Sequence, residues 1–206
     1  MTGWYRFGYK LSWALGRLLF SFKVVGRDRI PSKGACILAM NHESYLDPPL
    51  AGISCRRPIH FLARKTLLEW PILGRIFPKV NVVPVNQERA DMSALKTIIK
   101  LVKAGECAIV FPEGARTPDG KLQPAQPGLG LVIAKTLAPV VPMRIFGAHE
   151  ALPYGSNQIR LRPIRIVVGE PIVFTEADLQ GSGRDLYQRL SERVMEKIAA
   201  IELPEE

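Results

Sequence analysis

Residues 35–49 read ACILAMNHESYLDPP, and this stretch decides the fold. Its first six residues form a short apolar run that is typical of a buried strand. Polar residues follow from Asn41, and a helix start is favoured at Pro48, because proline suits the first helical position and aspartate the cap before it. A strand, a polar turn and a helix in this order indicate one unit of an α/β sheet.

Similar apolar runs recur along the rest of the chain. They predict strands at residues 35–40, 59–63, 80–85, 107–111, 140–145 and 164–168. Helical spacing of apolar residues predicts helices at 92–103, 129–137 and 183–201. We therefore expect an α/β fold with a mixed, largely parallel sheet flanked by helices. The length of 206 residues, 47% of them apolar, suits a single domain with a substantial core.

The N-terminal stretch, residues 4–22, is rich in aromatic and leucine side chains but carries Arg6, Lys10 and Arg17. These charges argue against a spanning helix, which needs about 18 uninterrupted apolar residues, and against a secretory signal. On a helical wheel the basic residues gather on one side, opposite the bulky apolar residues Trp4, Leu11, Leu15, Leu18 and Phe22. Residues 1–22 are therefore predicted to form an amphipathic helix on an anionic membrane surface; the alternative is a helix packed on its own domain.

Composition limits the partners. The net charge of +9 and pI near 9.7 imply an anionic partner, either nucleic acid, an anionic bilayer or a phosphorylated substrate. Nucleic acid is disfavoured, because the aromatic residues concentrate in the N-terminal segment and do not interleave with a basic patch. Cys36, Cys55 and Cys107 sit among apolar residues and read as buried, reduced thiols of a cytosolic setting. We find no metal-ligand cluster, phosphate-binding loop or dinucleotide fingerprint, so neither a metal nor a cofactor is expected.

His42 and Asp47 lie five residues apart in the polar turn after the first predicted strand. Taken singly, Asp47 could serve only as a helix cap, and His42 could face either a cleft or solvent. A short turn can bring the two side chains within hydrogen-bond reach. The carboxylate then fixes the tautomer of the imidazole and stabilises the imidazolium, which leaves the other nitrogen to take a proton from a substrate hydroxyl. Such a pair activates an alcohol directly, so Ser44 need not be a nucleophile.

Three motifs occur in order along the chain. Asn41-His42 with Asp47 forms an N-H-x4-D pattern, residues 111–117 read FPEGART, and residues 141–143 read VPM. In this combination the sequence resembles the glycerophospholipid acyltransferases, and most closely the 1-acyl-sn-glycerol-3-phosphate acyltransferases, over roughly residues 20 to 170. The resemblance implies that His42 is the catalytic base and Asp47 its partner, and it associates residues 141–143 with the acyl side of the site.

The second motif is expected to bind the acceptor. The resemblance assigns Glu113 and Arg116 to this role, with Arg116 on the acceptor phosphate. A guanidinium and backbone N–H groups in a Gly-containing turn can grip a phosphate bidentately; the alternative is an arginine that only faces solvent. Glu113 should bind acceptor hydroxyls or brace nearby basic groups, because a carboxylate facing the phosphate would be repulsive. Gly114 and Thr117 complete the expected set of acceptor-binding residues.

Lys65 and Arg89 are further candidates for the acceptor site, because each follows a predicted strand. The chain departs from the family here. Relatives often have Arg directly after a V-[DN] pair, whereas Gln87 follows Val85-Asn86, so either Arg89 substitutes or this phosphate contact is absent. Relatives also often show F-K-x-G where this chain has residues 125–128, AQPG. The two missing cations leave open another lysolipid as acceptor.

The resemblance thus implies an enzyme that transfers a fatty acyl group from acyl-CoA or acyl carrier protein to the sn-2 hydroxyl of 1-acyl-sn-glycerol-3-phosphate. The product would be phosphatidic acid. We expect an acyltransferase domain at residues 23–206, and a peripheral or monotopic protein on the cytoplasmic face of the cell membrane. A non-catalytic membrane-binding protein would explain the N-terminal helix but would leave His42, Asp47, Glu113 and Arg116 without a role.

Overall fold

The computed structural model describes residues 3–64, 66, 69, 73–76, 80–85 and 92–204. The helices are α1 Gly3–Phe20, α2 Asp47–Ser54, α3 Leu73–Ile76, α4 Met92–Lys103, α5 Gly128–Thr136, α6 Ala148–Ala151 and α7 Gly183–Ala199. The strands are β1 Lys23–Val25, β2 Cys36–Met40, β3 Phe61–Arg64, β4 Val82–Val85, β5 Cys107–Val110, β6 Val140–Phe146 and β7 Arg165–Val168. Short 3-10 turns lie at Arg27–Arg29 and Glu176–Leu179.

The sheet is mixed and mostly parallel, as the sequence predicts. Within the described residues the main sheet runs β1-β7-β6-β2-β5, and only the β6–β7 pair is antiparallel. A second parallel pair, β3-β4, adjoins β5 just before β3 begins. There the N–H of His60 donates to the carbonyl of Cys107, and the N–H of Ile109 donates to the carbonyl of His60. The α/β class and the flanking helices are confirmed, whereas β1 was not expected from the sequence.

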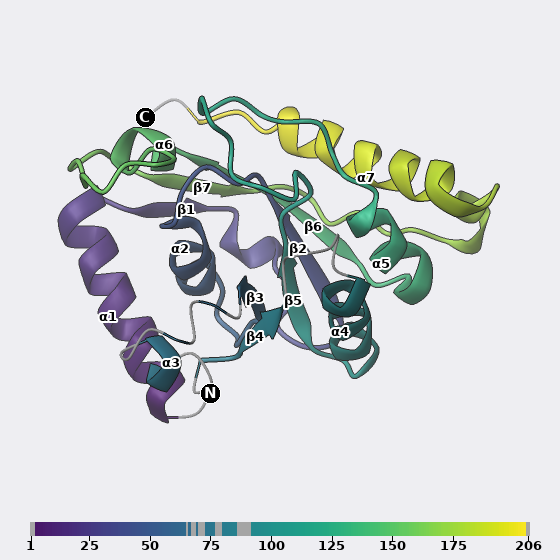
Figure 1. Cartoon of the computed structure of the whole chain (residues 1–206), viewed down its shortest axis with the longest axis horizontal. Coiled ribbons are helices and arrows are strands. Elements are labelled where there is room, and N and C mark those ends of the chain that lie inside the picture. The colour runs from purple at the N-terminus through teal and green to yellow at the C-terminus, as the bar shows by residue number, and fades with distance from the viewer. Residues whose placement is uncertain are drawn as a thin grey trace.

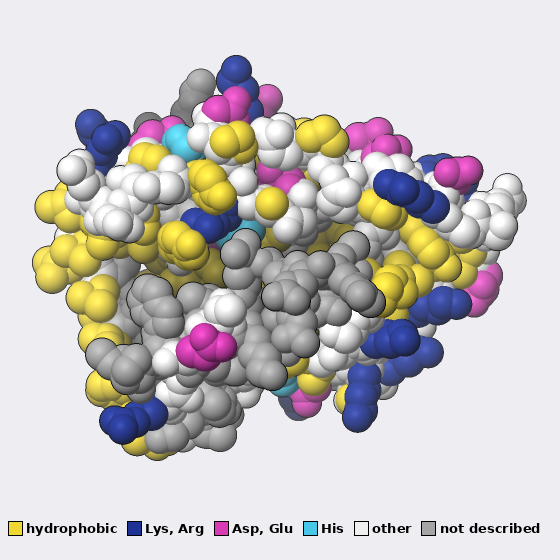
Figure 2. Space-filling model, viewed as in Figure 1, with side chains coloured by type: hydrophobic (Ala, Val, Ile, Leu, Met, Phe, Trp, Pro, Cys, Tyr) yellow, Lys and Arg dark blue, Asp and Glu magenta, His cyan; other side chains and the backbone are white. Residues whose placement is uncertain are grey.

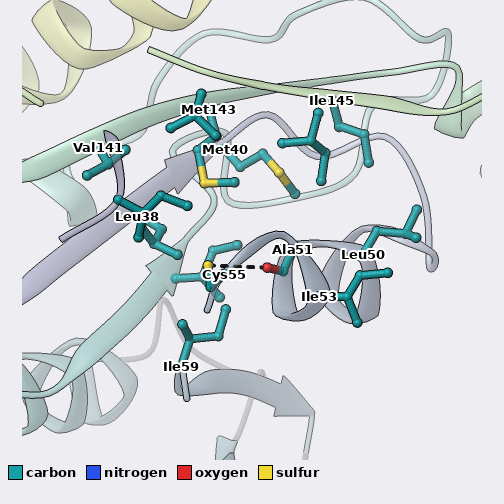
Figure 3. Close-up of a cluster of buried hydrophobic side chains, with 14 of the residues drawn as sticks. Leu38, Met40, Leu50, Ala51, Ile53, Cys55, Ile59, Val141, Met143 and Ile145 are labelled. Atoms are coloured by element: carbon teal, nitrogen blue, oxygen red, sulfur yellow. Dashed lines mark hydrogen bonds between the residues drawn. The ribbon is translucent and has the colours of Figure 1, made fainter. Parts of the chain in front are cut away.

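Helices cover both faces of the main sheet, and each face has its own apolar core (Figure 1). On one face, β2 and β6 pack against α2, with side chains such as Met40, Ile53 and Met143 fully enclosed (Figure 3). On the other face, α4, α5 and α7 lie over the same strands. Central strands enclosed on both sides read as continuous apolar runs, which is why the sequence pattern locates them well.

Helix α1 packs along one side on its own domain, which is one of the two arrangements that the sequence left open. Tyr5, Gly16 and Phe20 are buried against the domain, and the hydroxyl of Tyr9 donates to the carbonyl of Ile53 at 3.2 Å. Large apolar side chains nevertheless remain exposed along the helix: Trp4, Phe7, Leu11, Leu15 and Leu18. Hydrophobic atoms accordingly line the left edge of Figure 2, where Figure 1 places α1.

Two details of this helix differ from expectation. The basic residues Arg6, Lys10 and Arg17 are exposed, but they flank the apolar stripe, because the side opposite the stripe packs on the domain. Phe22, which we expected on the exposed apolar side, lies beyond the end of the helix and is fully buried. No helix in the described part of the chain is both long and apolar enough to cross a bilayer.

The topology brings the motifs to one edge of the sheet. Strands β2, β5 and β6 run parallel, so their carboxyl ends meet at the same edge. The turn with His42 follows β2, the segment 111–117 follows β5, and α6 follows β6. Ligands of open α/β sheets bind at this edge, which makes it the place to look for a site.

Candidate active site

His42 is the side chain around which the site is built. Its Nδ1 lies 2.7 Å from Asp47 Oδ2, and its ring stacks on Phe111 with centroids 4.0 Å apart and planes 17° from parallel. Phe111 follows β5, the neighbour of β2, so the sheet itself sets this stack. The side chain of His42 is 17% exposed, and its Nε2 has no hydrogen bond to any described residue. The nitrogen away from Asp47 is therefore the one available to a substrate.

Asp47 is not a helix cap, contrary to one reading of the sequence. Helix α2 begins at Asp47 itself, and no side chain caps it. Instead Asp47 Oδ2 turns back and accepts the backbone N–H groups of Glu43 and Ser44 at 2.6 and 2.8 Å, besides its contact with His42. The side chain is fully enclosed, and burial raises the pKa of this carboxyl, while the contact with His42 lowers it. These bonds fix the carboxylate as a partner for the imidazole.

Glu113 joins the two motifs through the backbone. Its Oε1 accepts the N–H of His42 at 2.8 Å, and its Oε2 accepts the N–H of Gln123 at 3.0 Å. Among the described residues it forms no ion pair with a basic side chain, and its expected role in bracing basic groups stays a prediction. Burial raises the pKa of Glu113, and the two N–H donors oppose that effect. The carboxylate holds the start of the His42 turn against the segment 111–123.

Gly114 and Thr117 shape the turn that carries Arg116. Gly114 has φ 74°, a left-handed conformation that suits glycine, and its N–H donates to the carbonyl of Phe111. The N–H of Thr117 donates to the carbonyl of His42 at 2.8 Å, while its buried hydroxyl bonds to Asp119 Oδ1 at 3.0 Å. Thr117 therefore ties the turn to His42 by its backbone, with its side chain directed into the turn itself.

Arg116 lies beside this turn with its guanidinium in contact with aromatic rings. The guanidinium carbon is 3.5 Å from the ring centroid of Tyr45 and 4.7 Å from that of Tyr154. The structure shows no hydrogen bond or ion pair from this guanidinium to any residue it describes. A half-buried cation whose N–H groups have no partner among the described residues is suited to bind a phosphate.

Other expected site residues are placed elsewhere or fall outside the described residues. Lys65 and Arg89 lie outside them. Val141 and Met143 are fully buried inside β6, where they pack in the core between the sheet and α2, and their assignment to the acyl side of the site stays a prediction.

Two polar residues of the first motif have roles that sequence reasoning missed. The amide of Asn41 accepts the N–H of Ile145 at 2.8 Å and donates to its carbonyl at 3.1 Å, which extends the pairing of β2 with β6. Glu43 Oε1 accepts from Asn41, and Glu43 Oε2 accepts the N–H of His149 at the start of α6. Burial raises the pKa of Glu43 to about 8, although the His149 N–H works against this rise. In the sequence, the only sign of these roles is that Asn41 and Glu43 stand directly beside His42.

The arrangement has a definite chemical capacity. An imidazole whose Nδ1–H is bound by a buried carboxylate can take a proton at Nε2 from a hydroxyl group. Arg116 is held nearby, because the adjacent Thr117 is bonded to the backbone of His42. A hydroxyl and an anionic group carried by one substrate could therefore be bound together. The described residues contain no cluster of side chains suited to hold a metal ion.

Comparison with known proteins gives consistent results. A family model described as Acyltransferase matches residues 21–146. A "1-acyl-sn-glycerol-3-phosphate acyltransferase BAT2, chloroplastic" of Brassica napus is 32% identical over 160 residues, which are 76% of this chain and 46% of that protein. A protein of Bacillus subtilis with the same activity in its name is 28% identical over 151 residues, 73% of each chain.

A solved structure agrees with these sequence matches. The crystal structure of the 1-acyl-sn-glycerophosphate acyltransferase PlsC from Thermotoga maritima superposes with a TM-score of 0.74 at 26% identity. The superposition covers 97% of this chain and 81% of the Thermotoga chain. The chain thus spans under half the length of the Brassica relative but most of the length of the bacterial structure.

Proposed function

The chain belongs to the Acyltransferase family, and we propose that it acylates the sn-2 hydroxyl of 1-acyl-sn-glycerol-3-phosphate to give phosphatidic acid. The acyl donor is a thioester, either acyl-CoA or acyl carrier protein. One observation carries this proposal. Hydrogen bonds from His42 N–H to Glu113 and from Thr117 N–H to the His42 carbonyl hold the His42–Asp47 pair near Arg116, whose guanidinium has no acidic partner among the described residues. The names of the relatives from Brassica, Bacillus and Thermotoga support the same acceptor.

In this reaction His42 Nε2 takes the proton of the sn-2 hydroxyl as its oxygen attacks the thioester carbonyl. The tetrahedral intermediate then collapses, the carbon–sulfur bond breaks, and the imidazolium returns the proton to the departing thiolate. Asp47 keeps Nδ1 protonated and stabilises the imidazolium, and no covalent acyl-enzyme is needed. Arg116 binds the acceptor phosphate and thereby places the hydroxyl near Nε2.

The decisive experiment is an acyl-transfer assay with the purified protein, a labelled acyl thioester and a panel of lysolipids. His42→Ala should lower turnover by about 10² to 10⁴-fold, since the general base is removed. Arg116→Ala should raise the Michaelis constant for the phosphate-bearing acceptor far more than that for the donor, since a charge-assisted bond worth about 1.5 to 3 kcal/mol is lost. Arg193→Ala is a matched control, because Arg193 also lies over an aromatic ring but on α7.

The assay also separates the alternatives. Acylation of another lysolipid in preference to 1-acyl-sn-glycerol-3-phosphate would keep the chemistry and change the acceptor. No transfer to any lysolipid from either donor, with the protein bound to membranes, would favour a non-catalytic membrane protein and contradict the proposed function.

For localisation, we propose that α1 rests on the anionic cytoplasmic face of the cell membrane. The support is the exposed apolar stripe of α1, in which Phe7 is 62% and Leu18 80% exposed, together with the basic residues along its flank. Polar replacement of Leu11, Leu15 and Leu18 should release the protein from vesicles containing anionic lipid. Val173→Gln, at a position 65% exposed outside α1, is the matched control.

Neutralising the basic flank tests the electrostatic part. Replacing Arg6, Lys10 and Arg17 with Gln should weaken vesicle binding by about 1 kcal/mol per residue and reduce its salt dependence. Binding that stays as tight as wild type at every salt concentration would contradict this part. Substitution is preferable to deletion of residues 1–22, because Phe20 and Phe22 belong to the core.

A further inference from the structure

Among the described residues, the guanidinium of Arg116 contacts aromatic rings and no acidic side chain. Tyr45 comes from the turn between β2 and α2, and Tyr154 from the segment between α6 and β7. These tyrosines lie far apart in the sequence, and both contact Arg116. Both residues are more than half exposed, at 59% and 54%, which places them at the surface of the protein. No carboxylate among the described residues competes for the cation.

A ring contact leaves the binding capacity of an arginine intact. The N–H groups of a guanidinium point outward in its own plane, so an aromatic ring over its face uses none of them. A carboxylate partner, in contrast, would occupy the paired N–H groups that a phosphate needs. Contact with aromatic faces also attracts the cation and restricts its rotation, which reduces the entropy lost when a ligand binds.

We propose that Tyr45 and Tyr154 are positioning residues for the acceptor: they hold the guanidinium of Arg116 so that its N–H edge is free to bind the acceptor phosphate. This inference rests on the proposed function and extends it to two residues that the motifs do not specify: Tyr45 occupies a variable position of the N-H-x4-D pattern, and Tyr154 lies outside the motifs. Tyr154 acts from a segment anchored beside the site, because Glu43 binds the N–H of His149 and Arg160 N–H donates to the carbonyl of Ala151.

The test replaces each ring while leaving Arg116 in place. Tyr154→Leu should raise the Michaelis constant for 1-acyl-sn-glycerol-3-phosphate about tenfold, with a much smaller change in kcat and in the Michaelis constant for the acyl donor. Tyr154→Phe keeps the ring face and should stay much closer to wild type. The same pair of changes at Tyr45 should follow the same order. Phe146→Leu is a matched control, because it removes an arginine–aromatic contact of 4.8 Å with Arg144.

A double-mutant cycle shows whether the tyrosines act through Arg116. In an Arg116→Ala background, Tyr154→Leu should add little to the Michaelis constant for the acceptor. A full additional tenfold rise there would overturn the proposal, and so would a Phe variant as impaired as the Leu variant. Thermal unfolding of each variant identifies any that fail to fold, and the Tyr45 series then decides.

Failure of the proposed function would be separately visible. If the wild-type protein does not acylate 1-acyl-sn-glycerol-3-phosphate, the same variants are compared by calorimetric binding of glycerol 3-phosphate, which needs no turnover. Weaker binding in Tyr154→Leu that depends on Arg116 would support the positioning role. Binding equal to wild type, or no binding by the wild type, would overturn it.

Discussion

Asp47→Asn separates the charge of the buried carboxylate from its hydrogen bonds. Asp47 Oδ2 accepts three bonds, from His42 Nδ1 and from the N–H groups of Glu43 and Ser44. Asp47 Oδ1 is buried and accepts none from the described residues. An asparagine oxygen can therefore replace Oδ2 and keep all three bonds, with its NH₂ group in the unpartnered position. The opposite orientation would set the NH₂ against three donors, each costing about 1 to 3 kcal/mol.

The expected loss follows from this orientation. Because the amide oxygen still accepts from Nδ1–H, His42 keeps the tautomer that leaves Nε2 free, and only the stabilisation of the imidazolium is lost. A carboxylate at hydrogen-bond distance favours a charged partner by about 1.4 to 4 kcal/mol. Turnover should therefore fall by about 10 to 1000-fold. A variant with the wrong tautomer would lose about 10⁴-fold, as known for catalytic triads.

Steady-state kinetics on both substrates, with thermal unfolding, would measure this effect. The Asn variant should keep its Michaelis constants close to wild type. Asp47→Ala leaves the three donors without an acceptor, so it should lose more turnover and unfold at a lower temperature. The reasoning would be refuted if the Asn variant kept wild-type turnover, or if its turnover and melting temperature matched those of the Ala variant.

Two further predictions concern stability. Burial raises the pKa of Glu43 from 4.5 to about 8, so the folded protein holds this proton more tightly than the unfolded chain. The contribution of Glu43 to the unfolding free energy should be full below pH 4.5 and be lost as the pH rises toward 8. Urea titrations at several pH values should show that Glu43→Gln flattens this decline. Parallel curves of unfolding free energy against pH for the wild type and the variant would contradict the prediction. A Cβ at Gly130 would lie 1.8 Å from the carbonyl oxygen of Tyr187, so Gly130→Ala should force α5 from α7 and destabilise by about 1 to 3 kcal/mol or more. Gly3→Ala is the control, because an added Cβ there meets no atom within 4 Å, and calorimetry should find its unfolding free energy within about 1 kcal/mol of wild type. Equal destabilisation by Gly130→Ala and Gly3→Ala would contradict the steric argument.

The sequence predicts the central strands well and the edges of the sheet less well. Strands β2, β5 and β6 are enclosed on both faces, so β2 and β5 are continuously apolar and β6 is interrupted only by Arg144. Strand β1 has only three residues, Lys23–Val25, and two of them are exposed, so its composition does not indicate a strand. It is a strand because it pairs with β7. The antiparallel direction of β7 depends on the path of residues 152–164, which no local periodicity encodes.

In the site, the sequence identified Glu113 and Asp47 but did not predict the hydrogen bonds that their carboxylates accept from backbone N–H groups. The spacing of His42 and Asp47 predicted their contact, which the structure shows at 2.7 Å. Glu113 binds N–H groups of His42 and Gln123, and a backbone donor leaves no residue-type signal at a distance of 71 positions. Tyr154 was missed for a similar reason, because an aromatic residue in a polar segment has no periodicity that would mark it.

The two prolines after Asp47 explain why this aspartate serves a histidine instead of a helix. A side chain that caps a helix start accepts backbone N–H groups from the residues two or three positions on. Pro48 and Pro49 have no N–H to offer, and the N–H of Leu50 already donates to the carbonyl of Leu46. The nearest free donors for the carboxylate lie behind it, at Glu43 and Ser44 and on the imidazole of His42. Prolines that favour the start of α2 thus also turn Asp47 toward the base.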